Sequence, residues 1–314
     1  MGRTFFRLSA VLLAFICLDV RPSLATPPKV VTTIPPLQSI AANVMQGIAT
    51  PKALLPGSAS PHSYALKPSD AKTLSEADLI VWVGPALEGF LEKSMKTLGN
   101  KAATLELLTE KDLLLLDSRD GDGDSDDHKH RDHEHGTHEH GEIDPHIWLN
   151  TINGKEIANL VARRLGEMDP ENGKKYLDNA REFSQRLDKI RRRLEVQLRS
   201  YATIPFMTYH DGFQYFEQAF SLHSKGYVTL NPERPIGAKR VTLLRASMAS
   251  DKVQCLFMEP QYEPKLVETL TEGTKVRTAI ADPLGADIPM GIDFYPKLIE
   301  NLGNAFVSCL SGKS

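Results

Sequence analysis

Short apolar runs alternate with stretches of helical pattern in two separate parts of the chain. The first part contains runs typical of strands at residues 29–34, 51–55, 79–83 and 104–108. Helical stretches separate them, beginning near Pro36, Pro68 and Ala86. After residue 204 the alternation returns, with strands expected at 205–209, 226–230, 254–258 and 276–281 and helices at 212–220, 238–249, 265–271 and 295–311. Such alternation predicts parallel sheets covered by helices.

A long helical pattern separates these two parts. From Tyr176 onward, apolar residues recur at steps of three and four, at Leu177, Ala180, Phe183, Leu187, Ile190, Leu194 and Leu198. This spacing predicts one apolar face on a helix of about 30 residues, roughly 45 Å long. Pro170 interrupts the helical pattern once before it, because proline lacks a backbone N–H. We therefore expect an α/β protein with two α/β lobes and a cleft between them.

The first 25 residues have the three parts of a secretory signal peptide. Arg3 and Arg7 give a positive start, residues 8–18 form an apolar run, and Ser23-Leu24-Ala25 is a typical cleavage signal. The apolar run falls well short of the roughly 20 residues that a membrane span needs. We therefore expect export, cleavage after Ala25, and no membrane span in the mature chain.

Residues 117–142 carry an unusual share of the charge and of the histidines. They hold ten acidic side chains against three basic ones, a net charge of −7, and six of the ten histidines. The whole chain carries a formal charge of −3, which gives no indication of a nucleic-acid partner or an anionic membrane surface. Because residues 117–142 lack apolar side chains, they cannot offset the entropy of ordering, and we expect a disordered loop.

The histidines of this loop are candidate auxiliary metal ligands, because His-rich tracts are a metal-binding composition. They are His128, His130, His133, His135, His138 and His140. The alternative is a solvated insertion whose histidines bind metal only incidentally. An affinity tag is a third reading, and the irregular spacing and internal position are evidence against it.

Three histidines outside the loop form a candidate metal site. His62 and His210 each follow a predicted strand, one in each half, and His146 stands at the far edge of the loop. Ligand sites of open α/β sheets lie beyond the carboxyl ends of the strands. Asp282 and Glu259 also follow predicted strands. Three imidazoles with at most one oxygen suit a tetrahedral Zn²⁺ site, whereas His223 has no such context and is expected to be structural.

Two cysteines, Cys255 and Cys309, remain after removal of the signal peptide. In an exported protein such a pair indicates one disulfide. It would close a loop of about 54 residues and stabilise the fold by about 4 kcal/mol on the chain-entropy model. The alternative, a two-cysteine metal site, needs further soft ligands that this chain lacks.

Several motifs together resemble the ZnuA-type zinc-binding periplasmic proteins of ABC importers. They are PHSYALKPSD, ADLIVWVGPALEGFLEK, DPHIWLN, YHDGFQYFE, MEPQ and ADPLGAD, and they run through nearly the whole mature chain. The resemblance implies two lobes joined by one long rigid helix, metal in the cleft, and delivery to an inner-membrane permease. It places His62, His146 and His210 as the three histidine ligands and Cys255–Cys309 as the disulfide. It also implies the acidic, histidine-rich insertion.

These expectations divide the chain into a signal peptide (1–25), an N-terminal lobe (26–168), a linking helix (169–203) and a C-terminal lobe (204–314).

The chain departs from the family pattern at the fourth metal ligand. Some relatives have a glutamate before the first ligand histidine, where this chain has Pro61. The fourth position is then water or Asp282. Manganese-type relatives replace the third histidine by a carboxylate, so His210 favours zinc.

We therefore expect a monomeric periplasmic protein that captures Zn²⁺ and performs no catalysis. Alternatives are a manganese-binding protein of the same class, a zinc buffer without a transporter, and a three-histidine zinc hydrolase. In the hydrolase, zinc would activate a water, with Glu259 or Asp282 as general base. The chain has neither an HExxH pair nor an evident substrate pocket.

Overall fold

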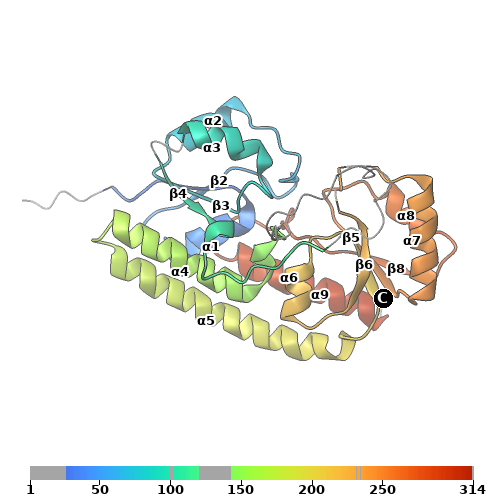
Figure 1. The fold of residues 1–314 in the computed structure, drawn as a ribbon. Coiled ribbons are helices and arrows are strands. Elements are labelled where there is room, and N and C mark those ends of the chain that lie inside the picture. Colours follow the sequence, from blue (N-terminus) through green and yellow to red (C-terminus); the bar gives the residue numbers. More distant parts are fainter. Residues whose placement is uncertain (1–25, 99–101, 120–142, 231, 234, 313–314) are drawn as a thin grey trace, which may run out of the picture.

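The computed structural model describes residues 26–98, 102–119, 143–230, 232–233 and 235–312. The expected signal peptide and the six loop histidines lie outside these ranges. Two parallel sheets of four strands each form two lobes side by side (Figure 1). The first sheet has the order β2-β1-β3-β4, with β1 Val30–Thr32, β2 Lys52–Ala53, β3 Leu79–Trp82 and β4 Ala103–Glu106. The second has the order β6-β5-β7-β8, with β5 Phe206–His210, β6 Ser224–Thr229, β7 Cys255–Met258 and β8 Arg277–Ile280.

Helices cover both faces of each sheet, as the apolar runs of the strands require. In the first lobe, Val30 and Val81 pack towards α1 (Pro35–Val44), and their strand neighbours pack towards α2 (Pro68–Ser75). In the second lobe, one face meets α6 (Gln214–Ala219) and α9 (Phe294–Ser311), and the other meets α7 (Ala238–Ser250) and α8 (Lys265–Thr271). The predicted fold class is confirmed: both lobes are α/β with parallel strands.

A pair of long helices lies beneath the lobes, and the longer of the two reaches under both (Figure 1). α4 (Thr151–Met168) ends just before Pro170, and α5 (Gly173–Leu198), which is 26 residues long, runs back along it and continues past its start. The buried face of α5 consists of Tyr176, Asn179, Ala180, Phe183, Leu187, Ile190, Leu194 and Leu198. Leu177 was expected on this face but is exposed. Tyr176 takes the buried position, and the next residue points about 100° away around the helix.

A single hydrophobic core runs from the first lobe to the second. The same cluster contains Val30 and Leu37 from the first lobe, Leu187 from α5, and Phe206 and Phe306 from the second lobe. Helix α5 contacts α1 on one side and α9 on the other. Continuous packing of this kind resists bending, because close-packed interiors are poorly compressible. The long helix is therefore held firmly against both lobes.

The second lobe is cross-linked by a disulfide between Cys255 and Cys309. Cys255 is the first residue of β7, and Cys309 lies in the last turn of α9. The predicted disulfide is thus confirmed. It ties the amino end of a central strand to the C-terminal helix. Among the described residues, no helix is long and apolar enough to cross a membrane.

A helix expected over residues 86–98 begins later than predicted. The chain first makes a short 3₁₀ turn at Gly89–Leu91, and α3 spans Glu92–Leu98. The fully buried Glu88 accounts for this start, since its carboxylate accepts hydrogen bonds from Thr33 Oγ1 at 2.5 Å and Gly84 N at 2.9 Å. These bonds hold the loops that follow β1 and β3 together. Burial raises the pKa of Glu88 to about 7, despite the hydrogen bonds that act against the shift.

Glu88 predicts a pH-dependent stability. Between about pH 4.5 and 7 the folded chain holds a proton on Glu88 that the unfolded chain releases, so its contribution to stability is lost as the pH rises. Glu88→Gln replaces the titrating carboxyl by a neutral amide, so the variant lacks this pH-dependent contribution. We expect the free energy of unfolding of the variant minus that of the wild type to increase by at most about 3 kcal/mol between pH 4.5 and pH 8. Urea unfolding of the zinc-free proteins measures this difference.

The exposed Glu92 on α3 provides a control. A hydrogen bond from Lys96 lowers the pKa of Glu92, so this carboxylate is ionised in both states above about pH 6. Between pH 6 and 8 the stability difference between Glu92→Gln and the wild type should stay constant. A constant difference for Glu88→Gln over the same range would contradict the protonation of Glu88 in the folded chain.

Candidate metal centre

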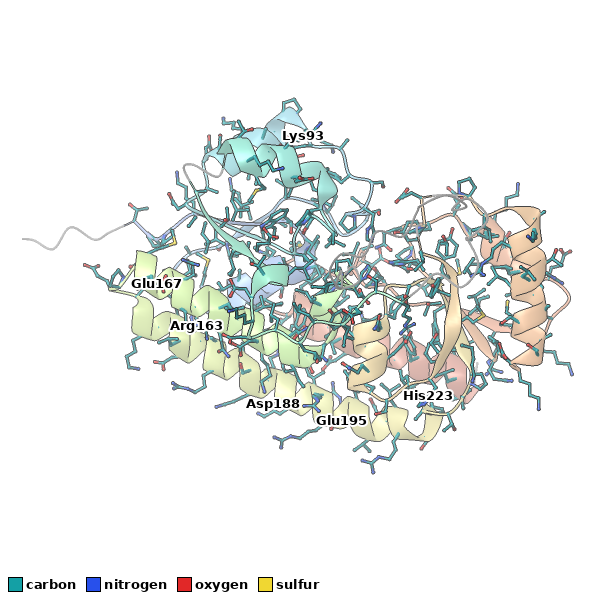
Figure 2. All side chains as sticks on the ribbon, viewed as in Figure 1. Lys93, Arg163, Glu167, Asp188, Glu195 and His223 are labelled. Atoms are coloured by element: carbon teal, nitrogen blue, oxygen red, sulfur yellow. A yellow bond between two sulfur atoms is a disulfide. The ribbon has the colours of Figure 1, made fainter. Side chains whose placement is uncertain are left out.

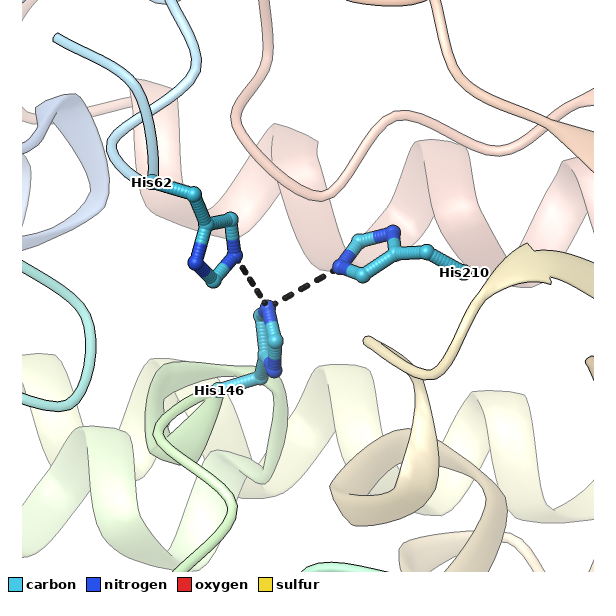
Figure 3. Close-up of side chains that lie close together, drawn as sticks. All are labelled: His62, His146 and His210. Carbon is cyan, nitrogen blue, oxygen red and sulfur yellow. Dashed lines mark hydrogen bonds between the residues drawn. The ribbon is translucent and has the colours of Figure 1, made fainter. Parts of the chain in front are cut away.

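Three histidines from three separate segments meet between the lobes. His62 lies in the loop between β2 and α2, His146 caps the 3₁₀ turn Ile147–Leu149, and His210 is the last residue of β5. Their rings point towards one another (Figure 3). One nitrogen of each ring can be chosen so that all three lie within 4.8 Å of one another. The structure thus brings together the three histidines that the sequence singled out.

Two of the three spacings between the ring nitrogens match a tetrahedral zinc site. His146 Nε2 lies 3.4 Å from His62 Nε2 and 3.2 Å from His210 Nε2. A zinc–nitrogen distance of about 2.0–2.1 Å places two ligands of a tetrahedron roughly 3.3–3.4 Å apart. His146 is therefore well spaced from both partners for such an ion, and the ligand atoms of His62 and His210 lie within 4.8 Å of each other.

Two buried carboxylates fix the orientation of two of the rings. Asp144 Oδ1 lies 2.8 Å from His146 Nδ1, and Glu259 Oε1 lies 2.5 Å from His210 Nδ1. With Nδ1 donating to its carboxylate, each ring can present the lone pair of Nε2 to the space between the rings. The Nε2 atoms of His146 and His210 lie 3.2 Å apart, close enough to share one proton or to bind one metal ion. The donor set therefore fits a positive ion.

The three rings differ in their exposure and in their pKa. His146 and His210 are 4% and 3% exposed, whereas part of the His62 ring meets solvent. The surrounding protein still removes enough water to lower the pKa of His62, and the nearby rings of His146 and His210 lower it further. Burial acts to lower the pKa of His210, but the carboxylate of Glu259 more than offsets this and raises it overall.

The space beside the three rings is small. A cavity of about 10 Å³ lies between Pro61, His62, His146, Trp148, His210, Glu259, Tyr262, Pro283 and Leu284. This volume is roughly that of one water-sized sphere. The cavity therefore has room for one small ligand such as a water, and none for an organic substrate.

Gly212 allows His210 to reach the centre. A Cβ atom at Gly212 would lie 2.6 Å from His210 Nε2 and 3.3 Å from His146 Nε2. Any side chain there would therefore displace the ligand atoms. The sequence analysis missed Gly212, and the adjacent motif YHDGF contains the signal, because a glycine two residues after a strand-end histidine leaves space for its ring.

The roles of the carboxylates differ from those expected. Asp282 is not part of the histidine cluster; its carboxylate accepts hydrogen bonds from the backbone N–H groups of Leu284, Gly285 and Ala286. Glu259, considered as a general base, instead holds His210. Asp144 was missed altogether. Its position two residues before His146 allows it to contact both the backbone N–H and the ring of that histidine.

The comparisons with known proteins identify the family. A profile described as zinc-uptake complex component A, periplasmic (ZnuA), matches residues 30–309. The chain belongs to the ZnuA family. Among its relatives is the high-affinity zinc uptake system protein ZnuA of Brucella suis, 41% identical over 306 residues, which cover 90% of this chain and 91% of that protein. The ZnuA of Yersinia pestis is 36% identical over 310 residues, covering 96% and 98% of the two chains.

Solved structures have the same fold. A zinc-bound ZnuA deletion mutant superposes with a TM-score of 0.75 at 21% identity, covering 92% of this chain and all of that one. The periplasmic zinc-binding protein TroA from Treponema pallidum superposes with a TM-score of 0.74 at 23% identity, covering 90% and 99% of the two chains. ZnuA-type proteins are thus the structural as well as the sequence relatives of this chain.

Proposed function

We propose that this chain captures Zn²⁺ in the periplasm on His62, His146 and His210 and delivers it to an ABC permease of the inner membrane. The observation that carries the metal site is the pair of Nε2 atoms on His146 and His210, which lie 3.2 Å apart while a carboxylate holds the Nδ1 of each ring. A permease partner, a monomeric state and a periplasmic location with cleavage after Ala25 belong to the same proposal. They are supported by the family and by the N-terminal sequence.

Water is the proposed fourth ligand. Asp282 already accepts four hydrogen bonds, three from backbone N–H groups and one from Gln261, so its use as a ligand would break several of them. The small cavity beside the rings accommodates one water. The six loop histidines are proposed as weaker auxiliary sites. We propose no catalytic step, since the site has no room for an organic substrate.

A competitive titration with Zn²⁺ and Mn²⁺ tests the proposal. Neutral imidazoles suit zinc, whereas manganese prefers oxygen ligands and stands at the weak end of the divalent series. We expect the mature chain, residues 26–314, to bind one zinc ion tightly and manganese at least about 100-fold more weakly. Equal affinities for the two metals would contradict the proposed function.

The affinity for zinc should depend on pH. Protons compete with zinc for the imidazoles, and His210 has a raised pKa, so it holds its proton while the pH is still above the usual 6.5. We expect the Kd for zinc to rise steadily from pH 8 to pH 5, by roughly tenfold per pH unit for each proton displaced. Isothermal titration in several buffers measures both the Kd and the protons released. A Kd that stays constant over this range would exclude a three-histidine site.

A further inference from the structure

The turn formed by residues 282–286 lies between the segments that carry the three histidines. Asp282 closes this turn: its Oδ1 accepts hydrogen bonds from Leu284 N and Gly285 N, both at 2.9 Å, and its Oδ2 accepts one from Ala286 N at 2.5 Å. On one side, Trp148 Nε1, two residues after His146, donates to Pro283 O at 2.8 Å. The turn is therefore a fixed support next to the metal centre.

The loop that carries His62 rests on this turn. A Cβ atom at Gly57 would lie 3.1 Å from Ala286 Cα and equally close to the carbonyl oxygens of Leu284 and Gly285. The two backbones thus touch directly, and glycine permits the approach. The contact joins the first lobe to the second, because Gly57 follows β2 and the turn follows β8.

The side-chain amide of Gln261 stabilises this contact between the lobes. Its Nε2 donates to Gly57 O at 2.9 Å and to Asp282 Oδ1 at 3.0 Å. The Asp282 carboxylate orients the amide, and the amide reaches across to the first lobe. Gln261 also stands two residues after Glu259, which holds His210. One short segment of the second lobe therefore contacts both His210 and the His62 loop.

His62 depends on its loop more than the other two histidines do on theirs. The rings of His146 and His210 are buried, and each is held by a carboxylate. His62 is an exposed residue, and among the described residues the only side-chain hydrogen-bond contact of its ring is with His146 Nε2. Its place is thus set by the loop of residues 56–63, which also contacts the second lobe through Ser60 Oγ at Tyr262 Oη (3.4 Å) and Ser63 Oγ at Glu233 Oε1 (2.8 Å).

We propose that Gln261, anchored on Asp282, clamps the His62 loop from the opposite lobe and thereby sets the rate at which zinc leaves the centre. This inference rests on the proposed function. Gln261 and Asp282 are then positioning residues that act through His62. The ion is captured first by the fixed pair His146 and His210, and its release begins when the clamped loop lifts.

Gln261→Met tests the clamp, because methionine keeps the length of the side chain and removes both N–H donors. We expect zinc dissociation, followed by stopped-flow transfer to a chelator, to become about tenfold faster, as the loss of one well-placed hydrogen bond implies. The association rate should stay within about twofold, since His146 and His210 keep their carboxylates. Gln218→Met, at an exposed position on α6, is the matched control and should change neither rate.

Hydrogen exchange of the zinc-loaded protein separates positioning from general destabilisation. Gln261→Met should speed the exchange of backbone amides in residues 57–66 and leave that of residues 144–150 unchanged. Unchanged dissociation, or faster exchange in both segments alike, would overturn the clamp. Slower dissociation would also overturn it, because that result is expected if the freed Asp282 carboxylate became a ligand. If the wild-type chain itself failed to bind zinc tightly, the proposed function would fail instead.

Discussion

His210→Ala is expected to lose tight zinc binding, with the Kd rising at least about 100-fold. Loss of a group that only supports a metal ligand typically costs 10–100-fold in affinity, and this variant removes the ligand itself. His210 lies 3.2 Å from His146 Nε2 and is almost fully buried, so no surface side chain replaces it. Competition with a chelator of known affinity measures the change.

Two further variants make this result specific. His210→Ala leaves the buried Glu259 without its partner and therefore lowers stability. His62→Ala has less effect on the fold because His62 is an exposed residue that leaves no buried carboxylate without a partner, and it should also weaken zinc binding. His223→Ala removes an exposed histidine outside the cluster (Figure 2) and should leave the Kd unchanged. Tight binding retained by both His62→Ala and His210→Ala would place the zinc site elsewhere.

Removal of the disulfide is expected to lower the free energy of unfolding by about 4 kcal/mol. Cys255 and Cys309 are 54 residues apart in the sequence, and on the chain-entropy model closure of a loop this long stabilises by about this amount. Both side chains are buried, so Cys255→Ala/Cys309→Ala is the suitable double variant. Urea unfolding of the oxidised wild type and the variant measures the loss.

The same variant should keep its zinc site. The disulfide lies at the amino end of β7, whereas Glu259 follows the carboxyl end of β7 and His210 is the last residue of β5. The Kd for zinc should therefore stay within a few-fold of the wild type under conditions where the variant is folded. Reduction of the wild type provides an independent comparison. A stability loss below about 1 kcal/mol would indicate that the chain-entropy model does not describe this loop.

The positions of the three histidines could be predicted from the sequence because of strand topology. Parallel strands place their carboxyl ends at one edge of a sheet, and His62 and His210 follow strands in different halves of the chain. The approximate strand positions followed from continuous apolar runs such as residues 79–82, all of which are buried. Helix α5 could be predicted equally well, because its apolar residues recur with a clear helical period.

The roles of the carboxylates could not be predicted in this way. Asp144, Glu259 and Asp282 all stand close in sequence to a strand end or to a candidate ligand, and any of them has the chemistry of a ligand. Their different roles depend on which backbone N–H or ring nitrogen each carboxylate contacts in the folded chain. Gln261 belongs to the motif MEPQ, but the sequence does not indicate its role, because that role depends on two acceptors that lie 204 and 21 residues away.

The core that continues beneath both lobes links the lifetime of the protein to its cargo. Since Val30 and Phe206 belong to one packed cluster, neither lobe keeps a closed interior without the other, and both should unfold in one cooperative transition. An ion bound where the lobes meet then stabilises every part of the chain, by about 2.7 kcal/mol at a free concentration 100 times its Kd. Zinc-starved copies would therefore be the first that proteases remove, so the pool of carrier protein would follow the supply of metal.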